Sequence, residues 1–145
     1  MVGDVAVLEK ICRSVSRDGR LRYGDVAALF RVFGFRLSRA LEALREGRVK
    51  KYVFRPSGRV VWLVVGRTRE YILMPSVDYC SCDDFYFRVV DGKVHLCYHL
   101  IAQRLAEALN CYDLILEEDR NYDILMDEWR EMSMRGGGGG VHDET

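Results

Sequence analysis

Two short pairs of potential metal ligands constrain this chain more than any other feature. A single residue separates Cys80 from Cys82, fourteen residues intervene, and Cys97 and His99 then repeat the same spacing. Zinc prefers four tetrahedral thiolate or imidazole ligands, and three cysteines with one histidine leave no open position for a reactive water. Cysteines so close in sequence are poor disulfide partners, because the bridge needs a particular separation and direction of the two Cβ atoms. The spacing therefore predicts one structural zinc ion (Zn²⁺) bound by these four residues.

The other cysteines and histidines fit this site less well. No apolar run reaches the roughly 20 residues that span a bilayer, and the N-terminus lacks a secretory cleavage pattern. We expect a cytoplasmic protein that does not associate with membranes, in which Cys12 and Cys111 are small buried side chains rather than disulfide partners. His95 is the alternative fourth ligand, but the paired spacing favours His99. His142 and three aspartates near the first pair are expected to be solvated: Asp78, Asp83 and Asp84.

A helical pattern begins at the second ligand pair. Apolar residues recur there at helical spacing, at Leu100, Ile101, Leu105 and Leu109. The Cys97 thiolate would then lie at a helix N-terminus, where backbone donors and the helix dipole stabilise negative charge. Three thiolates leave the zinc centre with a formal charge of −1, which we expect Arg104 to offset in part.

The remaining periodicities predict an α+β fold. Helical spacing recurs over residues 3–17 and 24–33, between Ser38 and Gly47, and over 122–134. A period of two over residues 49–54, 60–65 and 70–74 predicts an antiparallel β-meander with 60–65 as its central strand, and residues 85–90 form a further candidate strand. The expected architecture is N-terminal helices, the meander, a zinc-bound β-hairpin with its helix, and a C-terminal helix.

This pattern divides the chain into four segments. Residues 1–48 form a basic helical region and residues 49–112 form the zinc-binding core. Residues 113–135 are expected to be an acidic C-terminal helix. Residues 136–145 contain five consecutive glycines and are predicted to be a flexible tail.

The net charge of zero conceals an uneven distribution of charge. Residues 1–69 hold 16 Lys and Arg against 6 Asp and Glu, whereas residues 70–145 hold 6 against 16. Such asymmetry points either to an anionic partner such as DNA or to mutual neutralisation of the two halves, within one chain or in a homo-oligomer. The candidate DNA contacts are the basic residues of the third helix and the hairpin after it: Arg36, Arg39, Arg45, Arg48, Lys50, Lys51, Arg55 and Arg59.

The ligand pattern resembles the SWIM zinc finger, whose signature is C-x-C followed by C-x-H. The resemblance covers about residues 49–110, and Ala102 matches the C-x-H-x-x-A extension of the Shu-complex recombination branch. The small size also resembles stand-alone archaeal SWIM proteins. The resemblance implies a zinc-stabilised hairpin and helix, no catalysis, DNA or protein binding, and partnership with a RecA-family recombinase paralogue in homologous recombination and DNA repair. A small residue such as Ala102 also lets the helix approach the hairpin closely.

Two other functions remain open at this level. Three helices followed by a basic hairpin also resemble a winged helix, in which the third helix enters the major groove and the turn over residues 56–58 is the wing tip. The chain would then be a transcriptional regulator with a structural zinc module. A module that binds only proteins is the third possibility. The sequence contains neither a phosphate-binding glycine loop nor the deaminase signature, so we expect no enzyme activity.

Overall fold

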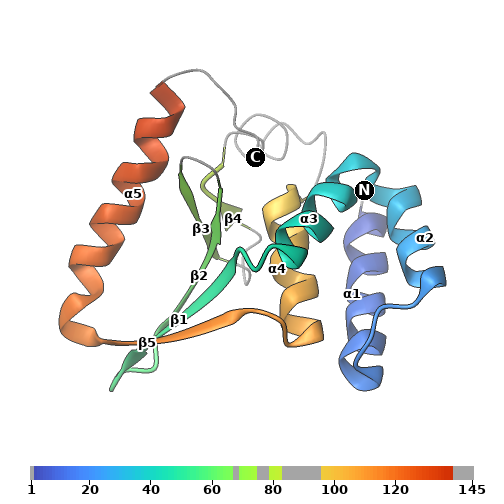
Figure 1. Ribbon diagram of the computed structural model, residues 1–145, viewed down its shortest axis with the longest axis horizontal. Coiled ribbons are helices and arrows are strands. Elements are labelled where there is room, and N and C mark those ends of the chain that lie inside the picture. Colours follow the sequence, from blue (N-terminus) through green and yellow to red (C-terminus); the bar gives the residue numbers. More distant parts are fainter. Residues whose placement is uncertain (1, 67–68, 75–78, 83–95, 139–145) are drawn as a thin grey trace.

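The computed structural model describes residues 2–66, 69–74, 79–82 and 96–138 and contains an α+β fold (Figure 1). Its helices are α1 (Val2–Asp18), α2 (Tyr23–Phe33), α3 (Phe35–Arg45), α4 (Tyr98–Leu109), the short η3 (Asp119–Asn121) and α5 (Tyr122–Gly138). Its strands are β1 (Val49–Arg55), β2 (Val60–Val65), β3 (Glu70–Met74), β4 (Tyr79–Cys80) and β5 (Asp113–Glu118). None of the helices in these segments combines the length and apolarity that a bilayer crossing requires.

The three N-terminal helices form where apolar residues recur at helical spacing. Leu8 of α1, Leu29 of α2 and Leu37 of α3 are completely buried and belong to one core. Gly34 joins α2 to α3 with a φ of 60°, a conformation that glycine adopts without the strain of a side chain. The chain therefore turns sharply at this residue, and α3 begins directly after it.

The predicted meander is confirmed, and its central strand is the predicted one. The five strands lie in the order β4-β3-β2-β1-β5, with β2 in the middle and antiparallel pairing from β1 through β4. The candidate strand over residues 85–90 lies outside the described residues.

Strand β5 was not expected at this position. Residues 113–118, predicted as part of the acidic C-terminal helix, instead pair in parallel with β1, from Lys50 opposite Asp113 to Arg55 opposite Glu118. The segment is short, begins soon after the left-handed cap Asn110 of α4, and has no strongly β-forming residues apart from Ile115. Pairing with β1, including the Lys50–Asp113 ion pair, therefore decides its conformation.

The two faces of the sheet pack against different helices (Figure 1). One face, with Trp62, Val64 and Leu73, shares a large core with α1–α4. The alternate residues Val61 and Leu63 face α5, where they form a smaller core with Met126 and Trp129. This alternation follows from the period of two in an extended strand, and it explains why β2 is apolar on both faces.

Helix α5 confirms the predicted C-terminal helix but extends further. It reaches Gly138, so the first three glycines of the predicted flexible tail are helical. Residues 139–145, with His142, lie outside the described part of the chain.

Candidate metal centre

The structure brings all four predicted zinc ligands together. The ligand atoms of Cys80, Cys82, Cys97 and His99 lie within 4.8 Å of one another, and all four residues are buried. Within the cluster, Cys97 Sγ lies 3.9 Å from His99 Nδ1. In a tetrahedral site with zinc–sulfur bonds of about 2.3 Å and zinc–nitrogen bonds of about 2.0 Å, neighbouring ligand atoms are roughly 3.5–3.8 Å apart. The donor set and its spacing therefore fit one tetrahedral zinc ion.

The first ligand pair is held at the edge of the sheet by β3. Cys80 is paired with Leu73 in the β3–β4 ladder. The Ser81 backbone N–H donates to the Ile72 carbonyl, and the Ile72 N–H donates to Ser81 Oγ, both at 3.0 Å. Residues two apart in an extended segment point to the same side. These bonds through Ser81 therefore leave Cys80 and Cys82 on the side that faces α4.

The second ligand pair opens helix α4, as the apolar periodicity predicts. Cys97 is the N-cap residue, and the Ile101 N–H donates to its carbonyl at 3.2 Å. Burial alone would raise the pKa of Cys97, but the thiols of Cys80 and Cys82 and the N–H groups of Leu100 and His99 hold this pKa well below its ordinary value. Thiolate is the form that binds zinc, and the helix N-terminus favours it here.

Burial raises the pKa of Cys80 well above its ordinary value. Three buried sulfur atoms this close cannot all be thiolates without a cation, because neighbouring like charges disfavour ionisation. A divalent cation removes this conflict by binding all of the sulfurs as thiolates. The electrostatics of the cluster thus agree with the metal that its geometry fits.

The His99 imidazole lies between two aromatic rings that the ligand spacing did not single out. Its centroid is 4.2 Å from the Tyr71 ring and 4.0 Å from the Tyr98 ring. The Arg69 guanidinium lies over Tyr71 and that of Arg39 over Tyr98, 5.6 and 5.8 Å from the ring centroids. This stack restricts rotation of the ligand ring. Tyr98 could have been noticed as the residue between the two ligands, whereas Tyr71 enters only through the fold.

Helix α4 places its other predicted residues differently. Ala102 is completely buried in the core, in agreement with close approach of the helix. Arg104, which we expected to offset part of the charge of the zinc centre, pairs with Glu9 of α1 at 3.4 Å. Arg104 lies five residues after His99 and seven after the N-cap, on the side of α4 that packs against α1.

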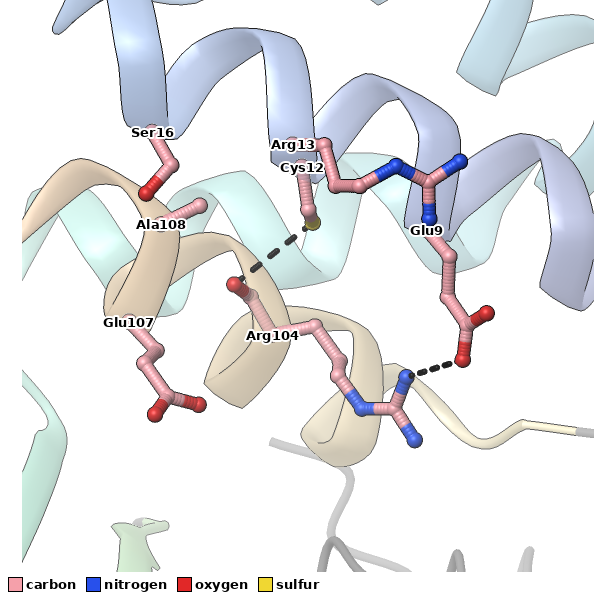
Figure 2. Close-up of a pocket in the computed structure, with 7 residues that line it drawn as sticks. All are labelled: Glu9, Cys12, Arg13, Ser16, Arg104, Glu107 and Ala108. Atoms are coloured by element: carbon pink, nitrogen blue, oxygen red, sulfur yellow. Dashed lines mark hydrogen bonds and ion pairs between the residues drawn. The ribbon is translucent and has the colours of Figure 1, made fainter.

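A shallow pocket of about 350 Å³ lies between α1 and α4 (Figure 2). Cys12 lines it and donates a weak hydrogen bond to the Arg104 carbonyl, with an Sγ–O distance of 3.6 Å. Burial raises the pKa of this thiol to about 11, so Cys12 is an unreactive, partly buried residue beside the core.

Cys111 is exposed, and its predicted place in the core is wrong because it follows the end of α4.

The remaining candidates near the metal fall outside the described residues. These are His95, Asp78, Asp83 and Asp84.

The eight basic residues suggested for DNA binding do not form one exposed group. Four are engaged within the protein: Arg48 pairs with Glu46, Lys50 with Asp113, Lys51 lies over the Trp62 and Tyr112 rings, and Arg59 lies over the Tyr122 ring. Arg36 is half-buried, and Arg39 reaches the Tyr98 ring while remaining exposed. Arg45 and Arg55 are exposed on α3 and at the β1–β2 turn.

Comparison with known proteins identifies relatives over most of the chain, although no protein-family model matches it. The zinc finger SWIM domain-containing protein 7 homolog of Dictyostelium discoideum is 34% identical over 98 residues, which cover 66% of this chain and 62%, less than two thirds, of that protein. Zinc finger SWIM domain-containing protein 7 of Mus musculus is 31% identical over 129 residues, which cover 87% of this chain and 84% of the mouse protein. The human protein of the same name is 28% identical over 128 residues, or 86% of this chain and 91% of its own length.

These relatives and the geometry lead to the same metal. The relatives are zinc finger proteins, and the buried Cys₃His cluster has tetrahedral spacing. Both observations indicate that the ion is zinc. The four ligands Cys80, Cys82, Cys97 and His99 bind one structural zinc ion.

Proposed function

The chain belongs to the SWIM zinc-finger family, and from this premise we propose that it is a non-catalytic accessory factor in homologous recombination and DNA repair. It binds DNA, a RecA-family recombinase paralogue, or both. The observation that carries the proposal is the closed zinc site, because a buried four-ligand centre stabilises a fold rather than performing a reaction. The function of the protein therefore depends on its surfaces.

The arginine-rich surface of the N-terminal helices supports DNA binding. Residues 19–45 contain six arginines and two acidic residues, and one of these arginines, Arg22, pairs with Asp18 at 2.9 Å. One of the acidic residues, Asp25, already accepts the Arg22 backbone N–H at 3.1 Å and caps α2. A surface with this excess of guanidinium groups attracts a polyanion, and binding to phosphates releases counterions.

An apolar area on β1, β2 and β5 supports a protein partner. Val60 and Leu116 lie on either side of Val53 in adjacent strands, and Leu114 lies next to them on the same face. Val60, Leu114 and Leu116 are exposed. Exposed apolar side chains gathered on one surface are typical of a binding site for another protein, and a recombinase paralogue is the partner we propose for it.

The winged-helix alternative is less well supported by the topology. A wing is a hairpin that projects from its domain to reach DNA, but β1 and β2 are central strands with neighbours on both sides. Asp119 also accepts hydrogen bonds from the Ser57 N–H and hydroxyl, at 2.9 and 2.7 Å, so the turn is attached to η3.

A DNA-binding assay with charge variants tests the proposal. Fluorescence anisotropy with oligonucleotides, over a series of salt concentrations, should show affinity that falls steeply with salt. The log–log slope should be about −2 to −4.5 if three to five phosphates are contacted. Arg31→Gln with Arg45→Gln should weaken binding and reduce this slope by about 1–2. The matched control, Arg120→Gln with Arg130→Gln, removes two exposed arginines from the acidic segment and should leave binding unchanged.

The same protein is then tested for recombinase binding. Co-expression with a RecA-family paralogue and purification on one tag should yield a complex with a fixed stoichiometry. A sequence-specific footprint on duplex DNA would favour a transcriptional regulator. Absence of both DNA binding and a recombinase complex would reject the recombination role.

A further inference from the structure

The exposed aromatic side chains of the described residues lie in one short stretch of the chain, from the start of α2 to the start of α3. Tyr23 is 88% exposed, Phe35 is 82% exposed and Phe30 is 46% exposed, whereas no other described aromatic residue is among the exposed large apolar side chains. All three belong to α2 or to the first residue of α3. Large aromatic surfaces in water are unfavourable, and such a group indicates a binding surface when it is not scattered.

Two of the three rings lie on one side of α2 and the third begins α3, and the three residues together are called the aromatic path below. Tyr23 and Phe30 are seven residues apart in α2, which is two helical turns and places both on one side of the helix about 10 Å apart. The turn at Gly34 then starts α3 at Phe35, five residues after Phe30. The buried Leu29 and Phe33, on an adjoining side of α2, pack this helix into the core, so the aromatic path lies on an element that is fixed in place.

Arginines lie beside this aromatic path. Arg31 follows Phe30 directly, and Arg39 lies one helical turn after Phe35; both are exposed. Arg39 also lies over the Tyr98 ring, so its guanidinium is held near α4 and the zinc centre. The only acidic residue of α3, Glu42, is two turns from its start. The surface thus combines π-faces with fixed positive charge.

Single-stranded DNA is the partner that uses both properties. Its bases offer unpaired faces that stack on aromatic side chains, while its phosphates accept hydrogen bonds from arginine. Duplex DNA has its bases already stacked and offers these rings little. An acidic protein would pair with the arginines but would place carboxylates next to the electron-rich faces of three rings, which is unfavourable.

We propose that α2 and the start of α3 form a binding surface for single-stranded DNA, with Tyr23, Phe30 and Phe35 stacking on bases and Arg31 and Arg39 contacting phosphates. This inference rests on the proposed DNA-binding function and names the form of DNA. It also places the base contacts outside the zinc-binding segment, on helices that the SWIM signature does not include.

The test compares single-stranded and duplex DNA binding in a double variant. Tyr23→Ala with Phe35→Ala should bind an unstructured oligothymidine at least 10-fold more weakly, because each lost stacking contact reduces affinity several-fold or more. Affinity for duplex DNA should change less than 2-fold. The control variant, Met74→Ala with Ile124→Ala, removes apolar side chains that are 46% and 65% exposed on β3 and α5 and should bind oligothymidine like the wild type.

A tryptophan placed in the path gives a readout of stacking itself. Phe35→Trp should retain oligothymidine affinity, and its fluorescence should be quenched when bases stack on the indole. The two natural tryptophans, Trp62 and Trp129, are buried and should contribute little to this change. Thermal unfolding of each variant should match the wild type, because the substituted side chains are on the surface.

The possible results separate the inference from the function on which it rests. If the wild type binds oligothymidine but the double variant binds it equally well, the aromatic surface is wrong and DNA binding stands. If the wild type binds only duplex DNA, base stacking is wrong. If no DNA binds at all, both are rejected. If the double variant loses only a protein partner, the surface is a protein interface and the inference is overturned.

Discussion

The two faces of the central sheet are closed by different chemistry. The face toward α4 holds four buried metal ligands inside its apolar core, with Leu96, Leu100 and Leu105 around them. The face toward α5 holds no metal ligand among the described residues and is closed by aromatic contacts. Tyr52 meets Trp129 at 4.8 Å and Phe54 meets Tyr122 at 5.0 Å between ring centroids.

This difference shows that a small domain can need a metal for one of its cores and not for the other. Buried thiols and an imidazole without zinc would be polar groups inside an apolar core, which is unfavourable. The aromatic face contains no such groups and can pack with or without the ion. We therefore expect the α4 face to require zinc and the α5 face to tolerate its loss for as long as the sheet itself remains folded.

Loss of a zinc ligand should have the largest effect. In Cys97→Ser the thiolate at the start of α4 is lost, and we expect bound zinc to fall from one per chain to below about 0.1. Structural zinc contributes about 10 kcal/mol or more, which is comparable to the whole stability of a small domain. Cooperative unfolding should disappear, as measured by elemental analysis together with circular dichroism during heating.

Cys111→Ser is the matched control for this experiment. Cys111 is exposed beyond the end of α4, so this variant should keep one zinc ion and the wild-type melting temperature. A Cys97→Ser protein that unfolds like the wild type would mean that the two faces do not differ in their dependence on zinc.

Truncation of the aromatic contact on the other face should have the second largest effect. Trp129→Ala removes a buried ring from the α5 core and should lower the free energy of unfolding by about 3–5 kcal/mol. Zinc should remain at one ion per chain, because the cysteine ligands belong to the core on the other face of the sheet. Urea unfolding gives the first quantity and elemental analysis the second.

Ile124→Ala is the control on the same helix. Ile124 is exposed, so its removal should change the unfolding free energy by less than about 0.5 kcal/mol. Loss of zinc in Trp129→Ala would show that the two cores act as one unit and would remove the distinction between the faces.

The sequence alone predicted the zinc-dependent face more completely than the other. Ligand identity and spacing are local properties of the chain, so Cys80, Cys82, Cys97 and His99 could be assigned from the order of the residues, and the apolar stripe placed Cys97 at a helix start. The central position of β2 followed from its apolar run, because only a strand covered on both faces tolerates one.

The features that the sequence did not predict depend on contacts between distant segments. Strand β5 becomes a strand through its pairing with β1, and Tyr71 reaches His99 because β3 passes next to α4. Arg104 was expected near the zinc, but the packing of α1 against α4 gives it Glu9 as a partner. The aromatic path was not predicted either, since helical spacing does not tell which aromatic residues remain exposed.

Removal of the hydrogen bonds between the β1–β2 turn and η3 should have a smaller effect on stability. Asp119→Ala removes both hydrogen bonds from Ser57, and because these groups are exposed we expect about 1 kcal/mol of destabilisation. Zinc content should not change, since the turn lies at the end of the strands away from the ligands. Urea unfolding measures the loss, and a loss above about 3 kcal/mol would mean that this turn organises the α5 face.

The alkylation rates of the cysteines in the wild-type protein should show how well the α4 face excludes solvent. In the zinc-loaded protein at pH 8, iodoacetamide should modify exposed Cys111 first and Cys12 at least 10-fold more slowly. The Cys12 pKa of about 11 leaves only about 0.1% of this thiol as thiolate at pH 8. The rate at Cys12 should rise about 10-fold per pH unit until pH approaches 11, since the thiolate is the reacting form. The three zinc thiolates should react only after chelation, as peptide mass spectrometry can measure. Rapid modification of Cys80 or Cys82 in the loaded protein would show that the α4 face opens to solvent more readily than its burial indicates. The two cores would then differ in the residues that form them but not in how well they exclude solvent.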